Sequence, residues 1–156
     1  MVKAIAIVRL RGRTGRNYHI EHTLKLLKLH KPNHAVVYQE SESLYGMLQK
    51  VKDTVTWGEI NSDTLEHLIV KRGELQGKNR INNKHIKEST QYATIKQFTK
   101  AVLKGEAKIK DVSDLQPVFR LSPPRKGFKS LKNPVNRRGD LGYRGEAINE
   151  LIARMA

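Results

Sequence analysis

Two separated segments of the chain carry clusters of cationic side chains with glycines between them. The first is the run Arg11-Gly12-Arg13-Thr14-Gly15-Arg16, which places three guanidinium groups within six residues. Glycine tolerates positive φ angles and lets the backbone approach a ligand closely, and guanidinium groups match the geometry of phosphate oxygens. The pattern therefore predicts a loop that binds a polyanion, and a solvated basic turn is the structural alternative.

The second segment, residues 123–145, contains seven Lys or Arg residues and a single acid, Asp140. Its apolar content is too low to form a core alone, so we expect it to be mobile and protease-sensitive until a partner orders it. Phe128 and Tyr143 add aromatic rings among these cations. Rings that can stack on unpaired bases, mixed with cations and glycines, favour a segment that follows RNA.

These two segments, with Arg9 just before the first and a few basic residues between them, define the candidate nucleic-acid contacts. They are Arg9, Arg11, Arg13, Arg16, Lys78, Arg80, Arg120, Arg125, Lys126, Lys129, Lys132, Arg137, Arg138, Arg144, Phe128 and Tyr143. Because two remote segments share one chemistry, we expect them to contribute to one extended footprint.

The charge of the whole chain agrees with this interpretation. A net charge of +15 and an isoelectric point near 10.2 predict a long-range attraction for nucleic acid or for an anionic membrane. No apolar run of about 18 residues and no signal segment is present, so nucleic acid is favoured over a membrane and a cytoplasmic location is expected.

No pattern indicates catalysis or a cofactor. Cysteine is absent, and His19 and His22 have no third ligand at a recognisable spacing, so no metal site is predicted. The glycine-rich signatures of nucleotide-binding loops are missing, and the carboxylates are scattered singly. We therefore predict no catalytic residue, no cofactor and no small-molecule substrate.

The elements that position the first loop are predicted from residues 1–60. Alternating apolar residues over 2–10 predict a strand that becomes cationic on one face, and a helix with Ile20, Leu24 and Leu27 inward follows the loop. Residues 35–38 read as a second strand, expected to lie parallel to the first because a helix connects the two.

A second helix and a third strand complete this part. Glu40 to Ser43 form a cluster of capping residues, and the helix after it turns Leu44, Met47, Leu48 and Val51 inward. Residues 53–57 read as the third strand, at whose end Trp57 is predicted to close the core. The fold class is α+β, a ferredoxin-like split β-α-β sandwich with a β-α-β-α-β core and two helices on one sheet face.

Residues 61–156 are predicted to be a mostly helical extension packed on the core of residues 1–60, within one domain. Helices are expected after residues 62–64, from Thr94 to Gly105 and over 146–155, with a fourth strand at 118–121 and the basic loop at 123–145. The polar run 77–84 is predicted to be a surface excursion.

Short motifs over nearly the whole chain resemble, in their order and spacing, the ribosomal protein L thirty family of the large subunit, in its long archaeal form, which is related to eukaryotic L seven. They are Gly15-Arg16, His22-Thr23-Leu24, Leu27, Leu29, His34, Tyr45-Gly46-Met47-Leu48-Gln49-Lys50-Val51, Val118-Phe119-Arg120-Leu121-Ser122-Pro123-Pro124-Arg125-Lys126-Gly127, Asn133-Pro134-Val135 and Leu141-Gly142. At Tyr45 the sequence departs from the bacterial form, which usually has arginine there.

The resemblance implies a structural constituent of the large ribosomal subunit that binds large-subunit ribosomal RNA near the 5S RNA, lies beside other ribosomal proteins and has no enzymatic activity. Two alternatives stay open at this point. One is a small hydrolase of phosphate esters or acyl phosphates, in which Arg16 holds the phosphate and a nearby asparagine positions water. The other is a stand-alone factor for ribosomal RNA processing or assembly.

Overall fold

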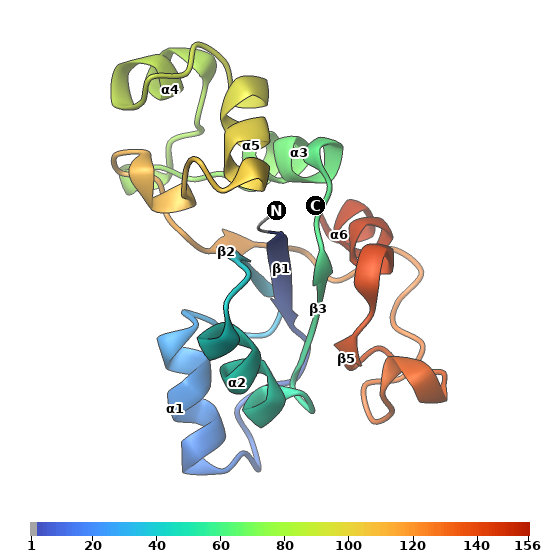
Figure 1. The fold of residues 1–156 in the computed structure, drawn as a ribbon. Helices are drawn as coiled ribbons and strands as arrows, with labels where there is room; N and C mark the ends of the chain where they lie inside the picture. Colours follow the sequence, from blue (N-terminus) through green and yellow to red (C-terminus); the bar gives the residue numbers. More distant parts are fainter. Residues whose placement is uncertain (1–2) are drawn as a thin grey trace.

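A computed structural model describes residues 3–156, and its first part is a strand, helix, strand, helix, strand unit (Figure 1). The elements are β1 (Ala4–Arg9), α1 (Tyr18–Leu26), β2 (His34–Gln39), α2 (Glu42–Val51) and β3 (Val55–Glu59). The predicted order is confirmed. Met1 and Val2, where the predicted core and its first strand begin, lie outside the described residues.

The prediction that β1 and β2 are parallel is wrong, because the structure pairs them antiparallel, with Ile5 opposite Tyr38 and Ala6 opposite Val37. The chain that leaves α1 returns to the end of β1 from which it departed. The N–H of Asn33 donates to the carbonyl of Arg9 at 2.7 Å, so β2 starts beside the last residue of β1. From this position β2 runs back along β1.

β3 also pairs antiparallel with β1, and two very short strands from the extension complete the sheet. The sheet order is β4-β2-β1-β3-β5, in which β4 (Phe119–Arg120) is antiparallel to β2 and β5 (Gly142–Tyr143) is parallel to β3. The predicted fourth strand is confirmed in part of its range. The fifth strand lies inside the segment that was expected to be a free loop.

The helices of the first part begin at polar caps. The side chain of Asn17 accepts the N–H of His19 at 3.0 Å at the start of α1, and Ser41 Oγ accepts the N–H of Leu44 at 3.1 Å at the start of α2. Such side-chain acceptors satisfy N–H groups that have no partner within the helix. The predicted capping cluster before α2 is thereby confirmed.

The extension is mostly helical, as predicted. Its helices are α3 (Ser62–Arg72), α4 (Asn83–Ser89), α5 (Ile95–Lys104) and α6 (Ile148–Met155), with single 3₁₀ turns at Gln76–Lys78, Ile109–Asp111, Val135–Arg137 and Gly145–Ala147. Gly105 ends α5 in the left-handed region, as expected of a helix stop. Residues 77–84 were predicted to be a surface excursion, and the last part of this prediction is wrong. Asn82 caps α4 there, and Ile86 buries one side of that helix.

Two separate cores lie on the two faces of the sheet. On one face Ile5, Ile7 and Trp57 pack against α1 and α2, so both helices share a face, as predicted. On the other face Ala6 and Val8 pack against α3, α5 and α6 (Figure 1). All six residues of β1 are therefore buried, and the expected cationic face of that strand does not reach solvent. The division into residues 1–60 and 61–156 stays a prediction.

Candidate nucleic-acid interface

The loop of residues 11–16 projects from the end of β1 and leads into α1. The N–H of Arg16 donates to the carbonyl of Arg13 at 3.2 Å, which closes a turn, and Gly15 has a φ of 73°. Apart from Gly15 itself and its two chain neighbours, no described residue has an atom within 4 Å of the position of a Cβ on Gly15, so this glycine meets a conformational need rather than a close contact. The turn leaves Arg13 exposed and Arg16 partly exposed.

Arg9 does not belong to this exposed surface, which corrects its assignment as a nucleic-acid contact. Its side chain is fully buried. Its Nε donates to the carbonyl of Arg11, its Nη1 to the carbonyl of Leu29 and its Nη2 to Glu21 Oε1, each at 2.8 Å. The alternation of β1 places Arg9 on the face of Ile5 and Ile7, which α1 and α2 cover, so this arginine anchors the loop from inside.

The other arginines of the loop are held more loosely. Arg11 Nη1 donates to the carbonyl of Asp53 at 3.3 Å, and Arg13 Nε lies 3.9 Å from Glu21 Oε2 while its side chain is 70% exposed. An exposed pair at this distance contributes little free energy. Arg13 can therefore exchange this carboxylate for another anion at small cost.

Residues 123–145 have a defined local structure, which differs from the expectation that a partner supplies their shape. Asp140 is buried, and its Oδ2 accepts the N–H groups of Lys129 and Ser130. Leu141 is also buried, and its carbonyl accepts the N–H of Val135 at 2.9 Å. The segment folds around its single acid, which composition alone could not reveal.

Arg144 pairs with the same acid, Asp140, and is therefore no longer a candidate contact for RNA. The Arg144 side chain is 8% exposed, and its Nη2 lies 3.0 Å from Asp140 Oδ1. Its Nε donates to Thr56 Oγ1 at 2.8 Å, which ties the segment to β3. Arg144 is therefore a structural cation, because its guanidinium has protein partners and little access to solvent.

The two predicted rings have different surroundings. Phe128 is partly buried against the core formed with α3, α5 and α6. Tyr143 is 56% exposed, but its hydroxyl donates to both carboxylate oxygens of Glu59, at 2.8 and 2.9 Å. This hydrogen bond, helped by burial and by the charge of Glu59, raises the pKa of Tyr143 above its ordinary value. The exposed ring of Tyr143 is the one that can offer a face to a base.

The sheet register brings several of the predicted cations to one end of the molecule. The loop leaves from Arg9, Arg120 pairs with His34 at the start of β2, and β5 pairs with Thr56 near the start of β3. These three positions lie at the end of β1 from which residues 11–16 emerge. Burial, followed by the charge of Arg120, lowers the pKa of His34 below its ordinary value.

Two arginines that the sequence analysis did not select hold the backbone of this region. Arg72 Nη1 donates to the carbonyl of Arg120 at 3.3 Å, and Arg154 Nη1 donates to the carbonyls of Arg125 and Gly127 at 3.1 and 3.2 Å. Both residues stand near the ends of helices, so their sequence context indicated only a favourable interaction with the helix dipole. Farther along, Lys78 is exposed and Arg80 donates to the carbonyl of Lys71.

The geometry gives no support to the hydrolase alternative. Asn17, the asparagine next to Arg16, uses its side-chain oxygen as the cap of α1. Within residues 3–156 no group of three or more His, Cys, Asp or Glu side chains is arranged to hold a metal ion. Nor does any helix in that range have the length and apolarity needed to cross a membrane.

Comparisons with known proteins agree on one family. The model of the family Ribosomal protein L30p/L7e matches residues 5–55. The large ribosomal subunit protein uL30 of Archaeoglobus fulgidus is 50% identical over 150 residues, which cover 96% of this chain and 98% of that protein. The uL30 proteins of Methanobrevibacter smithii and Thermoplasma volcanium are 45% and 44% identical, over 96% and 97% of this chain and 97% and 92% of their own lengths.

These relatives are named as ribosomal proteins and not as enzymes, and their archaeal origin and full-length matches confirm the resemblance to the long form. The chain therefore belongs to the large ribosomal subunit protein uL30 family.

Proposed function

We propose that this protein is a structural component of the large ribosomal subunit and binds ribosomal RNA through the exposed cations of residues 11–16 and 123–145. Its relatives are named as proteins of the large ribosomal subunit, which supports the choice of partner. The family assignment also supports a cytoplasmic location and contacts with neighbouring ribosomal proteins. The vicinity of the 5S RNA is part of the same proposal.

One observation carries the RNA-binding part of the proposal. The only acid of residues 123–145, Asp140, is buried and bound to Arg144 and to backbone N–H groups. The other cations of the segment are all exposed, and none of them forms an ion pair within residues 3–156: Arg125, Lys126, Lys129, Lys132, Arg137 and Arg138. A fixed segment that displays cations and hides its acid is suited to a polyanion.

The proposed contacts separate into residues that touch RNA and residues that position them. Arg9 and Arg144 belong to the second group, since their guanidinium groups are held inside the protein. The first group comprises Arg11, Arg13, Arg16, Lys78, Arg80, Arg120, the six exposed cations of residues 123–145 and the ring of Tyr143. Phe128 supports the segment through its packing on the core.

The proposal is tested by measuring the affinity of the protein for a large-subunit ribosomal RNA fragment at several salt concentrations. Each phosphate contact releases condensed counterions, so the logarithm of the affinity should fall by roughly 0.7 to 0.9 per contact for each unit of log salt. Replacing Arg137 and Arg138 with alanine should reduce that slope. The matched control replaces Lys96 and Lys100, which are exposed on α5, and should leave the slope nearly unchanged. A flat salt dependence of the wild-type chain would overturn the proposal.

Sedimentation of a cell lysate separates the structural role from a role in assembly alone. A structural component should travel with mature large subunits in stoichiometric amount. A factor that acts only in processing or assembly should be found with precursor particles and be absent from mature subunits, and that result would contradict the proposal.

A further inference from the structure

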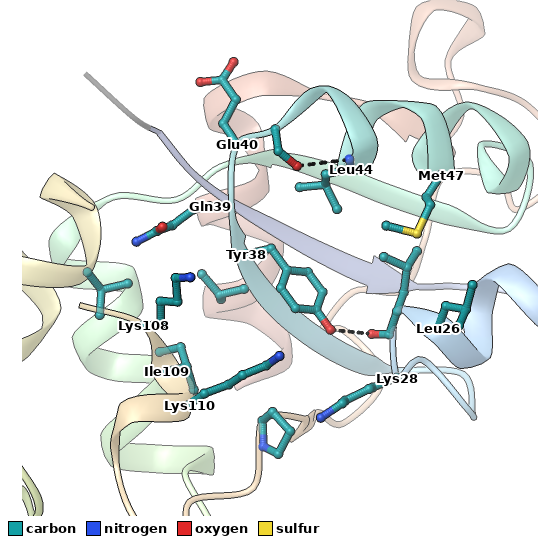
Figure 2. A pocket seen from close by; sticks show the side chains of 15 residues that line it. Leu26, Lys28, Tyr38, Gln39, Glu40, Leu44, Met47, Lys108, Ile109 and Lys110 are labelled. Carbon is teal, nitrogen blue, oxygen red and sulfur yellow. Dashed lines mark hydrogen bonds between the residues drawn. The ribbon is translucent and has the colours of Figure 1, made fainter. Parts of the chain in front are cut away.

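A cavity of about 420 Å³ lies beside the outer edge of β2, and none of the predicted contact residues lines it (Figure 2). The pairing of β2 with β4 ends at Ala35. Beyond that point Val37, Tyr38 and Gln39 form one wall of the cavity, and residues 108–110 form another. The function proposed above makes no use of this cavity.

Apolar atoms make up the larger part of the cavity lining. The ring of Tyr38 stands in the middle of the site, with Leu26 and Met47 beyond it (Figure 2). The hydroxyl of Tyr38 donates to the carbonyl of Leu27 at 3.0 Å, which holds the ring in place. Leu26 is 60% exposed and presents apolar surface to this cavity. An apolar surface of this kind loses water favourably when a flat ring covers it.

Three lysines surround this apolar interior. Lys28 lies at the end of α1, and Lys108 and Lys110 lie on the opposite wall (Figure 2). None of the three forms an ion pair within the described part of the chain. Glu40 is the only carboxylate of the lining, and it already accepts the hydroxyl of Tyr45 at 2.8 Å. The rim therefore carries an excess of positive charge.

Lys28 reaches the cavity from the turn that ends α1. Its φ is 63°, in the left-handed region that is common after a helix, and the N–H of Leu29 donates to the carbonyl of Leu24 at 2.8 Å in the same turn. These backbone bonds hold the residue that carries one of the three cations of the lining.

We infer that this cavity takes up one unstacked nucleotide of ribosomal RNA, with its base against Tyr38, Leu26 and Met47 and its flanking phosphates on Lys28, Lys108 and Lys110. The inference uses the proposed function only in naming ribosomal RNA as the partner. A nucleotide combines an uncharged flat ring with charge confined to the backbone, which matches an apolar interior with a cationic rim.

The three methionines of the chain provide a direct test. In the full chain labelled at the methionine methyl groups, Met47 reports on the cavity and the fully buried Met155 reports on the fold. An oligouridylate of about six nucleotides should shift the Met47 signal and leave Met155 unchanged. An abasic oligonucleotide of the same length should bind more weakly and move Met47 little, since it lacks the ring. A Met47→Leu variant assigns the signals.

Charge-matched variants separate the cavity from general electrostatics. Lys108→Ala with Lys110→Ala should weaken oligouridylate binding by roughly tenfold, because two phosphate contacts are lost. The control pair, Lys96→Ala with Lys100→Ala, removes the same charge from α5 and should change the Kd by less than about twofold. An equal loss in both pairs, no Met47 response, or an equal response to the abasic strand or to polyglutamate would each overturn the inference.

The outcome is separable from that of the proposed function. A silent Met47 together with salt-dependent binding of a large-subunit RNA fragment would overturn only the nucleotide cavity. A Met47 response together with no binding of that fragment through residues 11–16 and 123–145 would overturn only the proposed interface.

Discussion

Nη2 of Arg9 lies 2.8 Å from Oε1 of Glu21, and the arginine side chain of this pair has no exposed surface, while 16% of the glutamate side chain is exposed. The second oxygen of the same carboxylate faces Nε of Arg13 in the exposed loop, at 3.9 Å. One carboxylate thus connects a buried cation with a displayed one. Through Glu21, the exposed loop of residues 11–16 is connected to the buried side chain of Arg9.

Replacement of Glu21 with alanine should destabilise the fold. The change leaves the Arg9 guanidinium buried without its counter-charge, and breaking such a pair costs about 3 kcal/mol. Denaturant unfolding monitored by circular dichroism measures the loss. Glu42→Ala is the control, because Glu42 also lies in the first turn of a helix but is exposed, and it should cost less than about 1 kcal/mol. Equal losses in the two variants would show that the pair adds nothing beyond the helix dipole.

Replacement of both Arg13 and Arg16 with alanine should weaken binding to large-subunit ribosomal RNA without unfolding the protein. Two guanidinium groups leave a turn that lies outside both cores, so the affinity should fall roughly tenfold at moderate salt. The free energy of unfolding should change by less than about 0.5 kcal/mol. Lys50→Ala with Lys52→Ala removes two other exposed cations as a control. Thermal melting of the free variant shows whether these arginines bind RNA or stabilise the fold. A large loss of stability would assign them a structural role.

Replacement of Asp140 with asparagine should expose residues 123–145 to protease. The variant removes the charge that pairs with Arg144 and weakens the acceptor of the Lys129 and Ser130 N–H groups. Limited trypsin digestion of the free protein, read by mass spectrometry, should show faster cleavage after Arg137 and Arg138 than in the wild type.

Asp114→Asn, at an exposed position with positive φ, is the matched control for this digestion and should behave as the wild type. Rapid cleavage of the wild type at the rate of Asp140→Asn would restore the view suggested by composition, in which the segment has no fixed shape before it meets a partner.

Stability at high pH should depend on Tyr45. Burial, followed by the hydrogen bond to Glu40, raises the pKa of Tyr45 from 10.0 to about 12. The unfolded chain therefore ionises this phenol at lower pH than the folded chain, so its contribution is fully present below pH 10 and is lost as the pH rises towards 12. The free energy of unfolding of the wild type and of Tyr45→Phe, measured from neutral pH upward, should converge or cross in that window. A constant difference would contradict the shift.

Local signals in the sequence predicted most of the elements. Ser41 and Thr94 precede apolar stripes and cap helices, and Gly105 ends one, because these effects act within a few residues. The direction of β2 was mispredicted, since it depends on where the chain re-enters the sheet at Asn33. The short helix α4 was missed because it buries a single large residue, Ile86, among polar ones.

The candidate site shows the same division between local and long-range information. The exposure of Arg13 follows from the glycines around it, which the sequence displays. The burial of Arg9 depends on two helices closing over its face of the sheet, although its alternation with Ile5 and Ile7 was a readable signal. The burial of Arg144 depends on Asp140 and Thr56. The one signal for it in the sequence was a single acid among seven cations, which could have indicated an internal ion pair. The cavity beside β2 is built from four segments distant in the chain and left no mark in any of them.

The two-residue strands β4 and β5 have a consequence for solubility. A sheet made of β2, β1 and β3 alone would end in strands whose outward N–H and C=O groups are open to any passing extended chain. The extension places a backbone against part of each border, at His34 and Ala35 on one side and at Thr56 and Trp57 on the other. The part of the chain beyond residue 60 thereby shortens the open edges at which the sheet could pair with another chain.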